Sequence, residues 1–191
     1  MRHQKKRWLA ALLTLCMLLS ILPSISLAFG ESEETWSGNR TNQTIDGGTH
    51  TITLSNLTID SPGLGKSAID ITGNADVTFI LEGNNTLSGR PNHPAIWVQS
   101  GSSVTFEGTG TLNTSAGGTT PGFGAAGIGG GYGASSNFGN ITINGGTIIA
   151  RGSGGGAGIG GGYEVGSGTV TGNVTINGGY VTAIGGSSGS T

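Results

Sequence analysis

The sequence has few charged residues. Only 9% of its 191 residues are Asp, Glu, Lys or Arg, whereas soluble domains usually contain about 25%. Disordered chains combine low hydrophobicity with high net charge, but this chain has 34% apolar residues and a formal net charge of −2. The apolar residues occur in short β-branched runs, which strands favour. The composition therefore favours a folded β protein.

Cysteine and proline are also scarce. The single cysteine, Cys16, lies in an apolar N-terminal run and is interpreted as part of that run. The remaining chain can form no disulfide, so packing or a metal must stabilise it. The 5 prolines, and the lack of a three-residue period among the 40 glycines, exclude collagen.

The first 28 residues have the features of a secretory signal peptide. Four basic residues within 1–8 precede the largely apolar run Leu9–Leu22, which is too short to span a bilayer. Small residues at Ser26 and Ala28 place cleavage after Ala28. We therefore predict a secreted or cell-surface protein without a membrane span after cleavage. Its parts would be a signal peptide at 1–28, a short leader at 29–42 and a repeat domain at 43–191.

Cleavage would make the protein acidic. It would leave four basic residues against ten acidic ones, a net charge of −6. The basic residues are Arg40, Lys66, Arg90 and Arg151. Because phosphate contacts need Lys and Arg, nucleic acid is not an expected partner.

Short patterns recur along the repeat domain. Units begin near Gln43, Ala68, Ala95, Ala126 and Ala157, and each contains up to three short β patterns separated by Gly, Asn or Ser. Repeated units of three short strands are typical of a solenoid. The repeats predict an all-β, right-handed parallel β-helix of about five coils.

Stacking the units predicts four apolar columns, because residues two apart share one face of a strand. The columns are Ile69, Ile96, Ile128 and Ile159; Val77, Val104, Ile141 and Val174; Phe79, Phe106, Ile143 and Ile176; and Leu87, Leu112, Ile148 and Val181. The intervening Thr78, Thr105, Thr142 and Thr175 would face outward. Asn144-Gly145 and Asn177-Gly178 are hairpin signals and leave an antiparallel barrel or sandwich as the alternative fold.

The stretch AGIGGGY occurs at Ala126–Tyr132 and at Ala157–Tyr163. The glycines partly match a phosphate-binding fingerprint, but no helical period follows either copy, and that site needs a helix N-terminus. Calcium-binding glycine repeats contain Asp, which is absent from 122–133 and 154–163. We therefore expect close packing at corners and no cofactor; a structural calcium has no supporting residues.

The acidic residues do not form a clear catalytic pattern. Asp70 and Asp76 share a unit near Trp97, and such a pair could serve a hydrolase or a calcium-dependent lyase. Later units have Gly129 and Gly160 at the position of Asp70, so turn and cap roles are expected. His93 is expected in a loop. No catalytic or metal-binding residue is predicted.

Aromatic residues are the stronger functional signal. Trp97 alternates outward between two inward residues, and Tyr132 and Tyr163 follow the two glycine stretches. Exposed rings on a rigid face can stack on sugars while acids and amides bind hydroxyl groups. The candidate carbohydrate-binding residues are therefore Trp97 with Asp70 beside it, and Tyr132 and Tyr163.

The series ITLSNLTID, SAIDITGNADVTFILEGNNTLSG, AIWVQSGSSVTFEGTGTL, AGIGGGYG and GNITINGGTIIARG resembles the β-helical repeat region of secreted surface proteins of Gram-positive bacteria. These carbohydrate-binding domain proteins are similar in fold to pectin lyases. The resemblance implies a non-enzymatic extracellular module that binds a polysaccharide or cell-surface glycan, or presents an adhesive surface. A polysaccharide lyase or hydrolase, and a purely structural adhesin stalk, remain alternatives.

The last unit, 157–191, would expose strand edges and the ends of the apolar columns. Solenoids need atypical terminal repeats, and open edges pair with other chains. We therefore expect that the chain continues beyond this unit or meets a partner there, with self-association through residues 157–191.

Overall fold

The computed structural model describes residues 33–60, 65–118, 123–133, 136–163 and 169–187. Within them the chain is all-β with parallel sheets, which confirms the all-β class and the parallel strand pairing of the prediction. The predicted signal peptide, residues 1–28, lies outside these residues. None of the described residues forms a helix long and apolar enough to cross a membrane.

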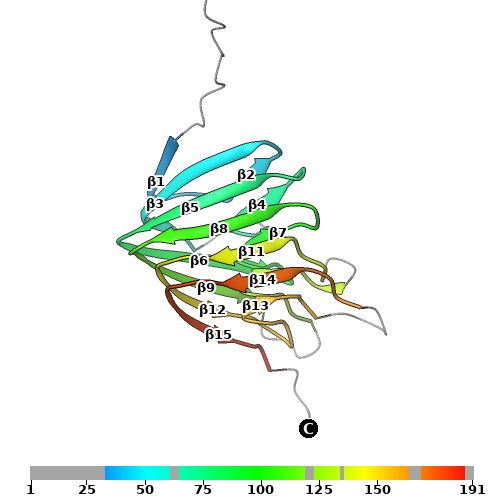
Figure 1. Ribbon diagram of the computed structural model, residues 1–191. Coiled ribbons are helices and arrows are strands. Elements are labelled where there is room, and N and C mark those ends of the chain that lie inside the picture. The colour runs from blue at the N-terminus through cyan, green and yellow to red at the C-terminus, as the bar shows by residue number, and fades with distance from the viewer. Residues whose placement is uncertain (1–32, 61–64, 119–122, 134–135, 164–168, 188–191) are drawn as a thin grey trace, which may run out of the picture. The chain divides into compact units, whose positions relative to one another are not determined.

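Five short strands, one from each repeat unit, form a parallel sheet in the order β13-β10-β7-β4-β2 (Figure 1). Its strands are β2 (Gln43–Asp46), β4 (Ile69–Thr72), β7 (Ile96–Val98), β10 (Ile128–Gly129) and β13 (Ile159–Gly160). Each strand opens its unit, so the sheet grows by one strand with every repeat.

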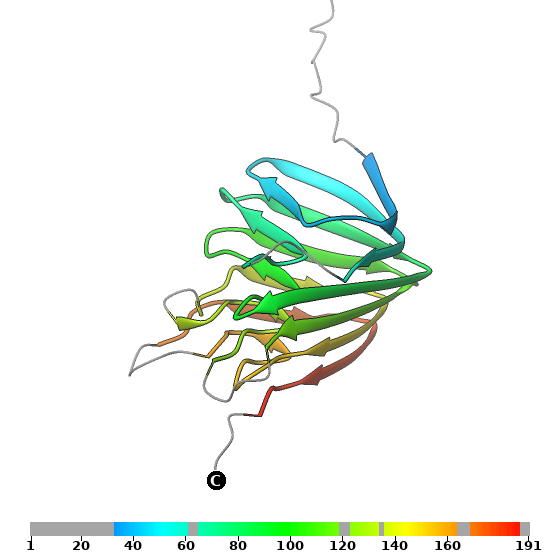
Figure 2. The ribbon, with the colours of Figure 1, turned by 180° about the vertical axis from the view of Figure 1, so that it is seen from behind.

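Ten strands form a second, strongly curled parallel sheet (Figure 2). Its centre is β3 (Thr49–Ile59), whose first half pairs with β5 and whose second half pairs with β6. One arm comprises β5 (Asp76–Glu82), β8 (Ser103–Gly108), β11 (Asn140–Ile143) and β14 (Asn173–Ile176). The other comprises β6 (Asn84–Pro91), β9 (Thr111–Gly117), β12 (Thr147–Arg151) and β15 (Tyr180–Ile184). The tenth strand, β1 (Glu33–Asn39), also pairs with β3.

The antiparallel alternative is wrong for the described strands, because all their pairings are parallel. Asn144 and Gly145 connect β11 to β12, which lie in different arms of the curled sheet. Gly146 follows them with a φ of 78°, a left-handed conformation that glycine adopts without steric cost. The Asn-Gly signal thus marks a corner between strands of one unit.

Three of the four predicted apolar columns are confirmed by the strand register. Val104 pairs with Val77 and Ile141, and Phe106 pairs with Phe79 and Ile143. The Ile69 column is likewise in register through β4, β7, β10 and β13. Its side chains and those of the other two columns are buried up to the fourth unit. The predicted threonine column lies between them on the outer face.

The fourth predicted column is wrong at its first member. Leu112 pairs with Asn85, and Leu87 pairs with Thr114, so the strand register differs by two residues. Asn85 is fully buried, and its Oδ1 accepts a hydrogen bond from Leu57 N at 2.9 Å. Its Nδ2 donates to the carbonyl oxygens of Glu82 and Thr111. Because its amide is satisfied by backbone groups, a polar residue can occupy a core position.

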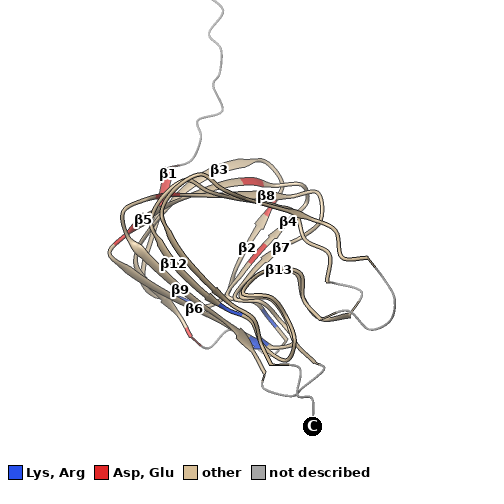
Figure 3. Cartoon of the chain, turned by 60° about the horizontal axis from the view of Figure 1, so that its bottom comes forward, with Lys and Arg blue, Asp and Glu red and all other residues tan. Residues whose placement is uncertain are grey.

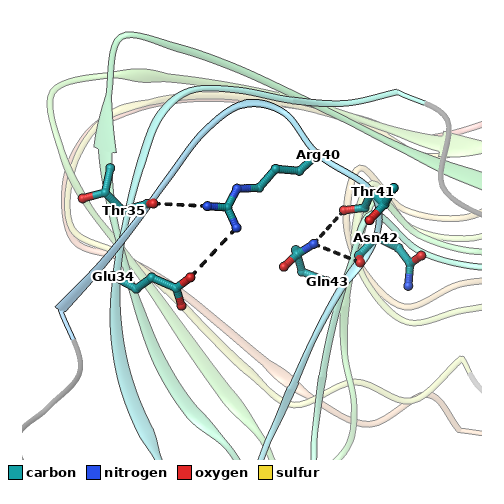
Figure 4. A network of polar contacts seen from close by, with 6 residues as sticks. All are labelled: Glu34, Thr35, Arg40, Thr41, Asn42 and Gln43. Atoms are coloured by element: carbon teal, nitrogen blue, oxygen red, sulfur yellow. Dashed lines mark hydrogen bonds and ion pairs between the residues drawn. The ribbon is translucent and has the colours of Figure 1, made fainter.

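Residues 33–39, assigned to the leader from sequence, form β1, which covers β3 at the N-terminal end. Trp36 of β1 is buried, and its ring lies 6.3 Å from the ring of Phe79. Arg40 lies over Trp36, and its guanidinium contacts the Glu34 carboxylate and the Thr35 carbonyl oxygen (Figure 4). Gln43 bonds to the carbonyl oxygens of Thr41 and Asn42 in the following turn. A large apolar ring and a local polar network therefore close this end of the core.

The two AGIGGGY stretches pack backbone against backbone. Gly129 and Gly160 pair in register, and a Cβ on Gly129 would overlap the carbonyl oxygen of Gly160. Their φ angles of 131° and 132° are also unfavourable for residues with a side chain. These glycines are required by close packing of neighbouring units, as predicted.

Candidate functional site

Asp70 and Trp97 lie side by side on neighbouring strands. Asp70 of β4 pairs with Trp97 of β7, and both side chains alternate with fully buried residues on the same strands. Both are half-buried. The next positions of this row are Gly129 and Gly160, so the acidic and aromatic side chains of the row occur only in the second and third units.

His93 supports the ring of Trp97. The two rings are 5.8 Å apart and nearly perpendicular, at 77°. His93 Nδ1 lies 3.0 Å from the carbonyl oxygen of Pro91, which fixes the imidazole. The sequence placed His93 in a loop without a role, because its contact with Trp97 depends on how residues 91–94 fold back. The sequence carried no signal for this contact, since a spacing of four residues brings side chains together on a helix but not in a loop and strand.

The carboxyl group of Asp70 lies in an unusual environment. Burial raises its pKa above the ordinary value, whereas nearby Ser67, Lys66 and His93 lower it. Oδ1 of Asp70 and Oγ of Ser67 are both buried without a hydrogen-bond partner. The Ser67 hydroxyl thus influences the carboxyl by proximity rather than through a bond of ordinary geometry. Two unsatisfied buried oxygens are costly, and both are covered by protein atoms.

Tyr132 and Tyr163 form a second aromatic cluster with Phe123. The tyrosine rings are nearly parallel, at 6°, with centroids 6.4 Å apart. The ring of Phe123 lies 5.2 Å from that of Tyr132 and is 47% exposed. Because Tyr132 packs on two other rings, it offers less open surface than the sequence suggested. Phe123 was not predicted, since its contact depends on a loop conformation.

Residues 91–94 connect the two clusters. The Tyr132 N–H donates to the carbonyl oxygen of Asn92 at 3.3 Å, and the adjacent His93 contacts Trp97. This segment therefore links the two clusters, which we together call the aromatic strip. It comprises Asp70, His93, Trp97, Phe123, Tyr132 and Tyr163.

Two other aspartates are hydrogen-bonded to serines of the next unit. Asp60 accepts a hydrogen bond from Ser88 Oγ, and Asp76 accepts one from Ser103 Oγ in the next unit. The charged neighbours that influence Asp70 are Lys66 and His93 rather than a second carboxylate. Within the described part of the chain, no three His, Cys, Asp or Glu side chains are grouped to hold a metal ion.

No protein-family model, curated protein or solved structure matches this chain.

Proposed function

We propose that the protein is a right-handed parallel β-helix that binds polysaccharide outside the cell through the aromatic strip. Consecutive units contribute equivalent strands that pair in the same direction and in register. That repetition supports a helical winding of the chain. The predicted signal peptide supports export, and a rigid stack of strands suits a long, repetitive ligand.

The observation that carries the binding proposal is the arrangement of Trp97 with Asp70 and His93. The indole is half-buried and braced by the imidazole, so it loses little conformational entropy when a sugar stacks on it. The half-buried side chain of Asp70 lies directly beside it on the neighbouring strand β4. An aromatic platform beside a hydrogen-bonding carboxyl group can hold the apolar face and the hydroxyl groups of one sugar unit.

Binding should depend on Trp97. A glycan array probed with the protein should show binding to a restricted set of glycans. Trp97→Ala should weaken this binding about 10-fold, because the loss of one stacking contact costs about 1.4 kcal/mol of binding free energy. Tyr180→Ala removes another exposed ring, at 69% exposure on β15, and is the matched control.

Unchanged binding by Trp97→Ala would refute this site, provided that wild type and variant have the same melting temperature. An array without any bound glycan would instead favour a structural adhesin stalk.

The raised pKa of Asp70 supports one enzymatic alternative. A carboxyl group that retains its proton above the usual range can act as a general acid on a glycosidic oxygen. Release of reducing ends or unsaturated products from a bound glycan, and its loss in Asp70→Asn, would establish a hydrolase or lyase. Binding without any such product would support the module without catalysis.

A further inference from the structure

A polar cavity of about 370 Å³ lies beside the paired ends of β1 and β3. It is lined by Asn39, Arg40, Thr58 and Asp60, none of which belongs to the aromatic strip. Small-molecule sites in proteins usually have volumes of about 300–1,000 Å³, so this cavity has the size of a site for a small ligand. All four lining side chains are polar, and two of them carry opposite charges.

Backbone pairing brings the lining residues together. Asn39 pairs with Thr58 across β1 and β3, and the Arg40 N–H donates to the Thr58 carbonyl oxygen at 2.9 Å. Thr58 and Asp60 are exposed, whereas Ile59 between them is fully buried. Because residues two apart share one face of an extended chain, Thr58 and Asp60 lie on the same outer face. The cavity is thus built on paired strands of the sheet.

A bulge in β3 precedes the cavity. Consecutive β1 residues Ser37 and Gly38 pair with the two residues of β3 that flank Asn56, so Asn56 is left out of the pairing. Its φ of 53° is left-handed, which asparagine tolerates better than most residues. Bulges bend a strand and redirect the side chains that follow, and they are common beside binding sites. Here the redirected side chains are those that line the cavity.

Arg40 and Asp60 are close in the backbone but have different partners. Figure 4 shows the Arg40 guanidinium directed toward Glu34 and Thr35. The Asp60 carboxylate instead accepts a hydrogen bond from Ser88 Oγ at 2.9 Å. Among the described residues no ion pair joins Arg40 to Asp60. Figure 3 shows how sparsely charged residues are distributed over the strands, so two neighbouring opposite charges that do not pair are an exception in this chain.

Both charged groups are held in place and can form further bonds. The guanidinium lies over the Trp36 ring, 5.6 Å from its centroid. It has five N–H donors, and its contacts with Thr35 and Glu34 are long, at 3.4 and 3.9 Å. A carboxylate accepts about four hydrogen bonds, and Ser88 supplies one to Asp60. A fixed cation and a fixed anion therefore border the same cavity with unused bonding capacity.

We propose that this cavity binds a small zwitterion of the α-amino acid type, whose carboxylate pairs with Arg40 and whose ammonium group pairs with Asp60. The planar fork of a guanidinium matches a carboxylate in two parallel hydrogen bonds. The amide of Asn39 and the hydroxyl of Thr58 can add neutral hydrogen bonds. A neutral sugar would use the hydrogen bonds but would match neither charge. The site does not depend on the proposed polysaccharide binding, since the aromatic strip uses other residues.

Isothermal titration of the purified protein with glycine, alanine and serine tests this proposal, because these zwitterions are small enough for the cavity. At least one should bind saturably at millimolar concentrations. Its amide lacks the carboxylate and its N-acetyl derivative lacks the ammonium group, so each should bind at least about 10-fold more weakly. Glucose, which carries no charge, should not compete.

Two variants remove the proposed partners of the ligand. Asp60→Asn removes the negative charge but retains an oxygen that can accept from Ser88, and it should weaken amino acid binding at least about 10-fold. Arg40→Gln should do the same, and its melting temperature reports whether β1 remains in place. Asp76→Asn is the matched control, because Asp76 also accepts a hydrogen bond from a serine of the next unit. It should bind like the wild type, as should Trp97→Ala.

Three results would overturn the proposal. The first is the absence of binding by all three amino acids, and the second is equal binding of an amino acid and its amide or N-acetyl derivative. The third is an Asp60→Asn variant that binds as tightly as the wild type. Binding of glucose that is lost in Asp60→Asn would instead identify the cavity as a sugar site, and would also overturn it. Polysaccharide binding through Trp97 would be unaffected by any of these results.

Discussion

Asp70 combines a structural cost with a proposed role in binding. Its carboxyl group is partly buried between Ser67, Lys66 and His93, and one of its oxygens has no hydrogen-bond partner. A turn-capping aspartate would have its oxygens satisfied, as Asp60 has with Ser88. Asp60 and Asp70 therefore differ in how far their carboxyl groups are satisfied within the chain.

The stability contribution of Asp70 should depend on pH. Burial raises the pKa of Asp70 in the folded protein above the ordinary 3.8. The protonated carboxyl group therefore contributes to the free energy of unfolding in full below pH 3.8, and this contribution is lost as pH rises through the folded-state pKa. Asp70→Asn has no such loss. The variant should therefore melt at a higher temperature relative to the wild type at pH 7 than at pH 3.

Thermal unfolding of both proteins from pH 3 to pH 7 measures this difference. If the melting temperature of Asp70→Asn falls relative to the wild type as pH rises, the carboxylate is stabilised in the fold and its assigned environment is wrong.

Two other residues mark the limit of sequence reasoning at this scale. No sequence pattern marked Asn85 as a core residue, since asparagine is usually exposed, yet it fills a core position through three hydrogen bonds to backbone groups. His93 contacts Trp97 through a fold of the chain between them. In both cases the position of the residue depends on a specific tertiary contact that no repeat pattern reveals.

At the scale of the strand, the alternation of apolar and polar residues gave most of the correctly predicted register. The inward columns of β5, β8 and β11 could be aligned from sequence because the period of two recurs in every unit and the inward residues are apolar. The alignment failed between β6 and β9, where the inward residues Asn85 and Thr114 are polar. β1 was missed because residues 33–39 match no other unit.

The two faces of β11 should respond differently to truncation. Ile143 is fully buried between Phe106 and Ile176, so Ile143→Ala should lower the free energy of unfolding by about 2–5 kcal/mol. Thr142→Ala, on the outer face of the same strand, should change it by less than about 1 kcal/mol.

Denaturant unfolding measures the free energy of unfolding of both variants, provided that their m-values equal that of the wild type. Equal losses would mean that the inward and outward faces of β11 are assigned wrongly, and with them the register of the whole arm.

At the scale of the molecule, the two ends of the fold differ in chemistry. The N-terminal end has a buried tryptophan, two glutamates and a bulged strand, whereas the C-terminal end has exposed Val174 and Ile176 on unprotected edges. The sequence predicted the inward columns to which Val174 and Ile176 belong. It could not predict the closure of the N-terminal end by Trp36, because residues 33–39 match no repeat. The ligand is the least predictable feature, since a sugar-binding ring and a ring that covers a loop have the same sequence signature.

The central claim is that Trp97 contacts a polysaccharide, and its own fluorescence is the most direct test. After the predicted signal peptide, the chain contains only Trp36 and Trp97, so Trp36→Phe leaves Trp97 as the single indole reporter. Titration with a panel of soluble neutral and acidic polysaccharides should shift or quench the Trp97 emission in a saturable way for at least one of them. Binding detected by affinity electrophoresis without any change in Trp97 emission would contradict the account, as would the absence of binding to every polysaccharide in the panel.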